Sequence, residues 1–309
     1  MLHLSTMTHP SPPSLPPVRS LSRVRPPSVP ALFLLVALLV PCGGMCAQDT
    51  SDVKPVNLAI VSGITLGTVI PVHIYQQTAW WQGPRAPFRF ENDWVYALNV
   101  DKLGHMYAGY LLSRVFGYSL EWSGFSEHTS TFYGSVLGLS YQMYVEVEDG
   151  FHRVYGFSPG DAFFNMIGAT IPLAQWTFPV LRNFSLKYSY WPSAGYTDAL
   201  KAGQGKAFLD DYQGTTVWLA MDPHFLMGSR LSDELPSWLG LALGVGARDL
   251  NESGGGRRQA TISLDYNFSR IQTGSSFLHS LLTVVDFFHL PAPGIRLDGK
   301  RVVFGVFYP

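Results

Sequence analysis

The most regular polar pattern of the chain lies in residues 99–168, a stretch that is otherwise apolar and rich in aromatic side chains. Several polar residues interrupt this stretch at a spacing of four positions, which places both members of a pair on the same face of a helix. We therefore expect three helices that each direct a short polar row into a common interior. The pairs are Asp101 and His105, Gln142 and Glu146, and Asp161 and Asn165.

The apolar pattern predicts a bundle of about four helices. Residues 56–74 contain no Asp, Glu, Lys or Arg, so this segment forms either a membrane-spanning helix or a fully buried one. Further helices are expected at about 99–118, 129–148 and 162–176.

Local signals mark the ends of two of these helices. Gly150 is expected to end the third helix in the left-handed C-cap conformation. Ser158 is expected to cap the fourth helix, with Asp161 at the third position of a capping-box-like arrangement. Pro172 is expected to kink or end that helix.

The pattern changes after residue 183. A loop rich in Tyr, Gly and Ser is expected up to residue 214, followed by segments in which apolar residues occupy every second position. Such alternation predicts antiparallel strands with one packed face. The candidate strands are 215–221, 239–245, 262–268 and 301–308, with 277–288 as a further one.

About five strands are too few for an outer-membrane barrel, which needs at least about eight. We therefore predict an α+β fold: an apolar N-terminal bundle of about four helices followed by a small antiparallel β-sheet that packs against it. The predicted divisions are a signal peptide (1–47), a helical domain that carries the polar cluster (48–181) and a strand-rich region (182–309).

The N-terminal segment has the features of an export signal. Three arginines precede the apolar run 31–40, and small residues lead to an expected cleavage site after Ala47. Cys42 and Cys46 are the only cysteines, so this cleavage leaves a mature chain without thiol or disulfide chemistry. Pro41 and Met45 precede them where a lipoprotein signal has small residues, which gives little support for lipidation.

Composition changes this picture in two respects. Charged residues make up only 14% of the chain, against about a quarter in a typical soluble domain. The shortage favours contact with a membrane or an unusually buried helical core. A net charge of −1 without a basic run gives no reason to expect nucleic acid as a partner.

The polar cluster allows two chemical interpretations. Asp101 and His105 form either a catalytic dyad, in which the carboxylate orients the imidazole base, or a buried pair that fixes the arrangement of the helices, with Lys102 neutralising the carboxylate. Glu146 and Asp149 lie three residues apart near a helix C-terminus, where the helix dipole disfavours carboxylates and a compensating cation is expected.

That cation is either a basic side chain or a divalent metal ion held by His105, Glu146 and Asp149, and no other cofactor is evident. Asp161 is interpreted first as a capping residue. Asn165 is expected to hydrogen-bond into the cluster. The candidate catalytic residues are Asp101, His105, Glu146 and Asp149, and the candidate binding residues are Lys102, Gln142, Asp161 and Asn165.

Several of these residues fall in motifs that occur in a fixed order, and the motifs resemble the YfiM-like family of predicted bacterial envelope lipoproteins. The family is of unknown function, so the resemblance implies an exported, envelope-associated protein and no particular chemistry. A looser likeness connects the chain to VanZ-like membrane proteins. The motifs are Asp101-Lys102-Leu103-Gly104-His105, Glu121-Trp122-Ser123-Gly124, Glu146-Val147-Glu148-Asp149-Gly150-Phe151 and Gly156-Phe157-Ser158-Pro159-Gly160-Asp161, with Asn165 and Gly168 behind the last.

Two hypotheses follow for the function. The first is an exported protein of the periplasm or the outer-membrane-associated envelope, membrane-associated, with a structural role or a role in binding lipid or an envelope protein. The second is a membrane-associated hydrolase or transferase that acts on an envelope lipid or a phosphate-linked precursor. In the second, His105 is the base, Asp101 orients it, and Glu146 with Asp149 holds a metal or stabilises charge.

Overall fold

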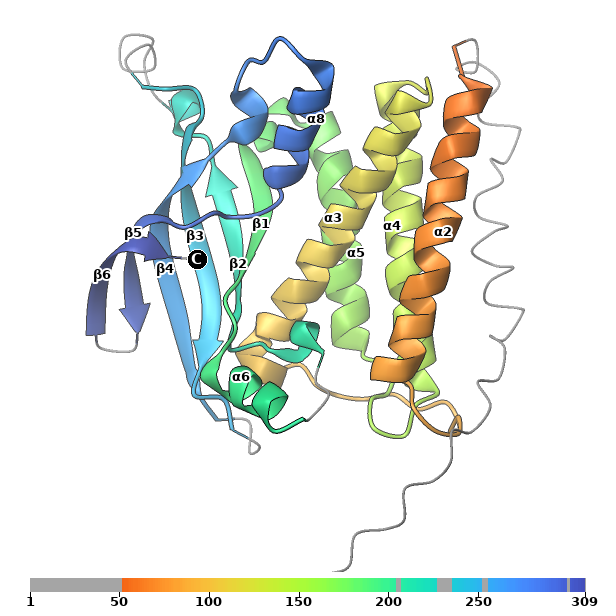
Figure 1. The fold of residues 1–309 in the computed structure, drawn as a ribbon, viewed down its shortest axis with the longest axis vertical. Helices are drawn as coiled ribbons and strands as arrows, with labels where there is room; N and C mark the ends of the chain where they lie inside the picture. Colours follow the sequence, from red (N-terminus) through yellow and green to blue (C-terminus); the bar gives the residue numbers. More distant parts are fainter. Residues whose placement is uncertain (1–51, 204–206, 227–234, 252–254, 299–300, 309) are drawn as a thin grey trace, which may run out of the picture.

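The protein is an α+β molecule in which a helical bundle lies beside a curved antiparallel sheet, as the sequence predicts (Figure 1). In the computed structural model, the described residues are 52–203, 207–226, 235–251, 255–298 and 301–308. The predicted signal peptide, including its two cysteines, lies outside them. The bundle consists of α2 (Pro55–Ala79), α3 (Val100–Trp122), α4 (Glu127–Gly150) and α5 (Pro159–Thr177).

The sheet is an antiparallel meander in which the strands follow one another in chain order. The four strands expected from alternation are present, and two more, at the edge that faces the helices and near the C-terminus, were not expected. The 183–214 region, expected to be a loop, holds β1 and a short helix, α6 (Ala194–Lys201). The strands are β1 (Phe184–Tyr190), β2 (Thr215–Met221), β3 (Leu239–Arg248), β4 (Arg257–Tyr266), β5 (Ala292–Asp298) and β6 (Arg301–Tyr308).

Two local expectations are wrong. Residues 277–288 do not form a strand, because Ser275 caps a helix, α8 (Ser276–Val285), by accepting a hydrogen bond from the Leu278 amide. Gly150 is a buried helical residue with negative φ, and a Cβ on it would lie 2.2 Å from the ring of Phe88. Close packing rather than a left-handed cap therefore requires glycine at this position.

Pro172 does not end its helix, since α5 continues to Thr177 with Pro172 buried inside it. The backbones of α3, α4 and α5 approach so closely that tertiary packing holds the helix through the proline. A Cβ on Gly168 would lie 1.9 Å from the carbonyl oxygen of Met106, and one on Gly134 would lie 2.6 Å from that of Ser113. These contacts hold α5 and α4 against α3.

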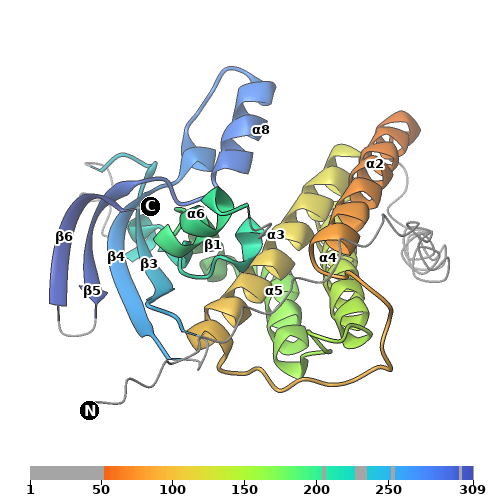
Figure 2. The ribbon, with the colours of Figure 1, turned by 60° about the horizontal axis from the view of Figure 1, so that its bottom comes forward.

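The sheet packs on the bundle through β1 and β2. Tyr107 on α3 stacks on Tyr188 of β1 with ring centroids 5.3 Å apart, and its hydroxyl donates to the carbonyl oxygen of Phe287. Leu186 and Val217, from the same sheet face, complete this core. The helical and strand-rich parts therefore share one hydrophobic cluster, which fixes the N-terminal end of α3 beside the sheet (Figure 2).

Helix α2 has an unusual distribution of side chains. Its buried residues are His73 and Gln76, whereas apolar residues along its outer side are exposed, among them Val56 (69%) and Ile64 (64%). It is the one helix in the described residues that is long and apolar enough to cross a membrane, and only 6% of its apolar window is buried. The sequence-based alternative of a fully buried helix is therefore wrong.

Candidate functional site

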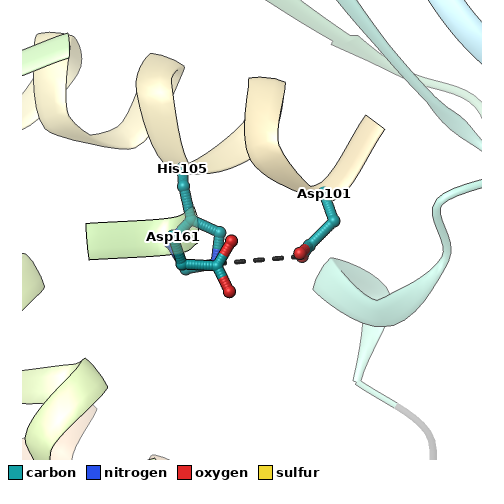
Figure 3. Close-up of side chains that lie close together, drawn as sticks. All are labelled: Asp101, His105 and Asp161. Carbon is teal, nitrogen blue, oxygen red and sulfur yellow. Dashed lines mark ion pairs between the residues drawn. The ribbon is translucent and has the colours of Figure 1, made fainter. Parts of the chain in front are cut away.

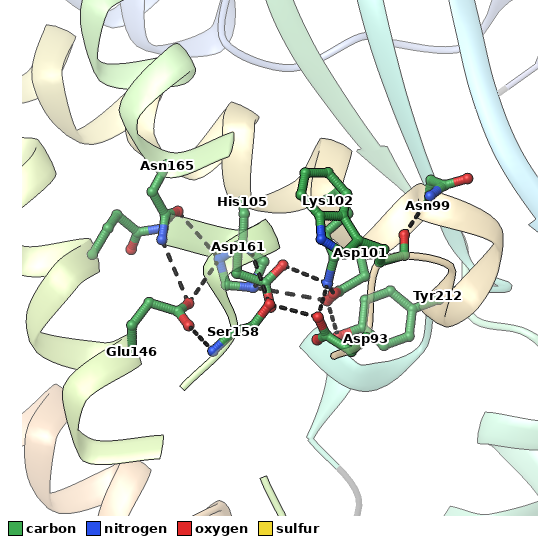
Figure 4. Close-up of polar contacts among 12 residues, drawn as sticks. Asp93, Asn99, Asp101, Lys102, His105, Glu146, Ser158, Asp161, Asn165 and Tyr212 are labelled. Atoms are coloured by element: carbon green, nitrogen blue, oxygen red, sulfur yellow. Dashed lines mark hydrogen bonds and ion pairs between the residues drawn. The ribbon is translucent and has the colours of Figure 1, made fainter. Parts of the chain in front are cut away.

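The polar residues of α3, α4 and α5 converge near the N-terminal end of α3 (Figure 4). At the centre is Lys102, whose side chain is completely buried. Its Nζ lies 2.8 Å from Asp93, 2.8 Å from Asp101 and 2.7 Å from Asp161. Although burial disfavours the charged amine, these carboxylates outweigh that effect and raise the pKa of Lys102. The ammonium group therefore joins a loop, α3 and α5.

Helix capping positions Asp161 in this cluster. Ser158 is the N-cap of α5, and its hydroxyl accepts a 3.0 Å hydrogen bond from the Asp161 amide, as the sequence predicts. The Asp161 carboxylate, however, points to Lys102 rather than back to Ser158 (Figure 4). The Ser158 amide instead donates to Glu146 of α4 at 3.4 Å, so the reciprocal part of the capping box comes from another helix.

His105 lies between the two sides of the cluster and is 24% exposed. Its Nδ1 donates to Oδ1 of Asn165 at 3.1 Å and lies 3.4 Å from Glu146. Its Nε2 is 3.8 Å from Asp101 and 3.7 Å from Asp161. Those two distances are too long for hydrogen bonds, so Asn165 rather than Asp101 orients the ring.

Gln142 and Asn165 form the amide side of the network. Gln142 Nε2 donates to Asn165 Oδ1 at 2.9 Å, and Asn165 Nδ2 donates to Glu146 at 3.5 Å. Asn165 has no exposed surface, and Gln142 is 8% exposed. All three predicted polar pairs thus meet in one interior, as their spacing indicates. Asp149 lies further away, with its carboxylate bound to the indole N–H of Trp81 at 2.6 Å.

Carboxyl groups outnumber cations in this interior, and burial raises the pKa of three of them. Burial raises the pKa of Glu146 to about 8, with Asp161 and Asp149 adding to the effect and His105 opposing it. Burial also raises the pKa of Asp161 to about 7 and that of Asp149 to about 6. Burial opposes charge on His105, yet the nearby carboxylates prevail and raise its pKa. The network therefore holds protons near neutral pH.

Sequence reasoning missed two members of the network. Tyr212, from the loop before β2, donates a 2.7 Å hydrogen bond to Asp101. Asp93 precedes α3 and binds Lys102. Burial alone would raise the pKa of Asp93, but the hydrogen bonds from Lys102 and Ser158 outweigh burial and lower it. Neither residue belongs to a helical repeat, so spacing gave no signal for them.

The network also provides a set of metal-binding atoms. One ligand atom each from Asp101, His105 and Asp161 lie within 4.8 Å of one another (Figure 3). The set predicted from sequence, His105 with Glu146 and Asp149, differs in its carboxylates. Lys102 already places a positive charge against Asp101 and Asp161, so a metal ion there would have to share these carboxylates with the ammonium group.

Comparison with known proteins places this site in a family. Residues 89–177 match the family model described as "Predicted periplasmic lipoprotein (DUF2279)". This segment is a YfiM-like DUF2279 domain. Neither the curated proteins nor the solved structures contain a match to the chain. The DUF2279 segment contains α3, α4 and α5 and every network residue named above except Tyr212, which the strand-rich part supplies.

The match of residues 89–177 to this family confirms the expected location in the cell envelope of an exported protein. The family is one of unknown function, and its description specifies no activity.

Proposed function

We propose that this DUF2279 protein is a membrane-associated structural component of the envelope, in which α2 contacts lipid and the polar network holds the other helices in place. The observation that carries the proposal is the inverted side-chain distribution of α2. Its polar residues face the protein: His73 Nδ1 lies 2.5 Å from the hydroxyl of Tyr144, and Gln76 accepts from Tyr141 at 3.4 Å. Its apolar residues face outward, and the contact of such apolar side chains with lipid is more favourable than their contact with water.

The length of α2 and its end residues support lipid contact. Its 25 residues correspond to about 37 Å, more than the roughly 30 Å of a bilayer core. Lys54 precedes the helix, and the partly exposed Trp80 follows it. Basic and aromatic residues at the ends of an apolar helix are typical of the membrane–water interface.

The network supports the structural part of the proposal. Lys102 connects three carboxylates from separate segments, and Glu146 connects α4 to the cap of α5. Removing one partner of such a buried network leaves an uncompensated charge, so the arrangement resists sliding of one helix along another. A fixed helix arrangement gives α2 a stable surface on α4.

Carbonate extraction of membranes tests this function. We expect the wild-type protein to stay in the membrane pellet, and Ile60→Lys/Ile64→Lys to enter the supernatant while keeping its melting temperature. Each lysine at the centre of a membrane helix costs about 3 kcal/mol, whereas both isoleucines are exposed and contribute little to the fold. Val154→Lys, at a 72% exposed loop position, is the control and should remain in the pellet. Release of the wild-type protein would refute the proposal.

The second candidate function is metal-assisted hydrolysis or group transfer at Asp101, His105 and Asp161. The closeness of their ligand atoms and the excess of carboxylates favour it. Elemental analysis of the purified protein tests it: a stoichiometric divalent metal that is lost in Asp161→Asn would support this function over the purely structural one. A metal-free wild-type protein in a buffer that supplies zinc, manganese and magnesium would exclude it.

A further inference from the structure

The sheet shows the same inversion as α2, on a different surface. In β3 and β4 the buried positions carry small or polar residues, and the exposed positions carry Leu, Val and Ile. In β4, Ser263 and Asp265 are 2% and 1% exposed, whereas Ile262 of the same strand is 52% exposed. A sheet folded for contact with water on its outer face has the opposite distribution.

The exposed apolar residues form a row across five strands. The register pairs Leu219 with Leu243, Leu243 with Ile262, Ile262 with Ile295, and Ile295 with Phe304. These side chains are 42%, 53%, 52%, 39% and 75% exposed in the same order. Neighbours on one sheet face touch, so the row is a continuous apolar strip. We call it, with its neighbours on the same face, the outer strip; those neighbours are Leu241, Val245, Leu264, Leu297 and Val302.

The outer strip lies on the convex side of the sheet. On the opposite face, Nζ of Lys187 in β1 lies 2.8 Å from Asp265 in β4 and donates to the carbonyl oxygen of Tyr266. Strands β1 and β4 are three strand spacings apart, which is about 14 Å in a flat sheet and beyond the reach of a lysine side chain. The sheet must therefore curl toward Lys187, and Figure 2 shows this bowed form.

The concave side is filled by its own polar groups. His289 stacks on Trp218 with ring centroids 3.7 Å apart, and its Nδ1 lies 2.9 Å from Asp265. Lys187 also binds Asp286, just after α8. This polar filling explains why the apolar residues of the strands point the other way, so the outer strip needs an apolar contact from outside.

We propose that the outer strip of β2–β6 binds the acyl-chain region of a single membrane leaflet. The inference rests on the membrane location in the proposed function, but not on the lipid contact of α2. A second copy is a poorer occupant, because two convex faces bury little area against each other. One end of the strip has the aromatic residues typical of a lipid interface, because Trp238, 39% exposed, contacts Tyr266 there.

The open edge of the sheet limits the depth of insertion. Strand β6 is the last strand of the described sheet, and unpaired backbone groups are too costly in the hydrocarbon of a bilayer. The outer strip therefore enters one leaflet and does not span the membrane.

Site-directed fluorescence tests this inference on the full chain. Replacing Cys42 and Cys46 by alanine gives a cysteine-free background, into which Leu243→Cys, Ile262→Cys and Ile295→Cys are introduced singly and labelled. We use vesicles of phosphatidylethanolamine and phosphatidylglycerol with brominated acyl chains as the quencher. The three labels should lose emission in brominated vesicles and be protected from iodide in the water. Asp249→Cys, 66% exposed at the end of the β3–β4 hairpin, is the control and should show the reverse.

The alternative occupants give different results. Labels quenched by iodide and not by bromine would show a water-facing strip, and labels quenched by neither would show that protein, such as a second copy, covers it. Either result overturns the inference. Ile64→Cys reports separately on α2. If bromine quenches the label on α2 but not the labels on the sheet, the inference about the outer strip is refuted and the role of α2 stands. If bromine quenches the labels on the sheet but not the label on α2, only the role given to α2 is refuted.

A charge variant provides an independent measurement. In the Ile60→Lys/Ile64→Lys background, where α2 no longer anchors the protein, Leu243→Glu/Ile262→Glu should lose binding to the same vesicles without a change in melting temperature, because both side chains point away from the folded interior. Val154→Glu in the same background is the matched control and should bind like the background protein. Unchanged vesicle binding of a folded Leu243→Glu/Ile262→Glu protein would also overturn the inference.

Discussion

The hydroxyl of Tyr212 donates a 2.7 Å hydrogen bond to Asp101, a residue 111 positions earlier in the chain. This bond connects the strand-rich part to the centre of the DUF2279 network. Burial and the Asp101 carboxylate raise the pKa of Tyr212 well above its usual value, so the phenol remains a hydrogen-bond donor.

We predict that Tyr212→Phe lowers the free energy of unfolding by about 1–3 kcal/mol, because a buried carboxylate oxygen loses its donor. Urea unfolding followed by circular dichroism measures the change. Tyr196→Phe, in α6 of the same part of the chain, is the matched control and should differ by less than about 0.5 kcal/mol. Equal effects of the two variants would show that the bond to Asp101 contributes nothing.

Lys102→Met should be the most destabilising change in the network. Removing the buried ammonium leaves three carboxylates without their cation, at a cost of roughly 3–5 kcal/mol. Lys201→Met removes an ion pair with Asp198 in which both side chains are more than 70% exposed. Such pairs contribute about 0–1 kcal/mol. Thermal unfolding of both variants gives the comparison, and similar losses would contradict a central role for Lys102.

Two glycines of the bundle should respond oppositely to alanine. Gly168→Ala places a Cβ 1.9 Å from the Met106 carbonyl oxygen and should separate α5 from α3, with a loss of about 1–3 kcal/mol or more. Gly104→Ala, also in a helix, meets nothing within 4 Å and should stabilise by up to about 1 kcal/mol. Melting temperatures that shift in the same direction would argue against the close helix contact.

Stability should fall as pH rises through neutrality. The pKa of Glu146 is raised to about 8 in the folded protein, from its ordinary value of 4.5 in the unfolded chain. The folded state therefore binds more protons in this window, and the free energy of unfolding decreases with increasing pH. Asp161, with a pKa of about 7, acts in the same direction. His105 does too, because its raised pKa gives stability that is lost as pH rises through it.

Melting temperatures measured from about pH 5 to about pH 8 test this sign. Glu146→Gln cannot ionise, so its melting temperature should depend less on pH than that of the wild-type protein. Glu127→Gln, at a 60% exposed position, is the control and should retain the wild-type slope. A wild-type protein that becomes more stable toward pH 8 would contradict the proposed protonation of Glu146.

The sequence predicted those features that depend on short-range spacing. The i,i+4 pairs placed Asp101, His105, Glu146 and Asn165 in one interior because helix geometry fixes the face on which each residue lies. The alternation of residues 239–245 and 262–268 predicted β3 and β4 for the same reason. It gave no information on which face is packed, since the polar filling of the concave side comes from distant segments.

Features that depend on long-range contacts could not be predicted. Tyr212 and Asp93 reach the network through loops, which have no periodic pattern. The apolar residues of α8 alternate well enough to resemble a strand, and only the cap at Ser275 indicates a helix. Pro172 stays helical because the contacts of α5 with α3 outweigh the lost backbone hydrogen bond.

The burial of Lys187 has a consequence for how the chain matures. Its ammonium lies between Asp265 and Asp286, and the latter follows it by 99 residues. If the polypeptide crosses the membrane unfolded, the Lys187 ammonium must stay hydrated until Asp286 has also crossed. Closing such a long loop is slow, so the curled sheet assembles only after almost the whole polypeptide has been translocated.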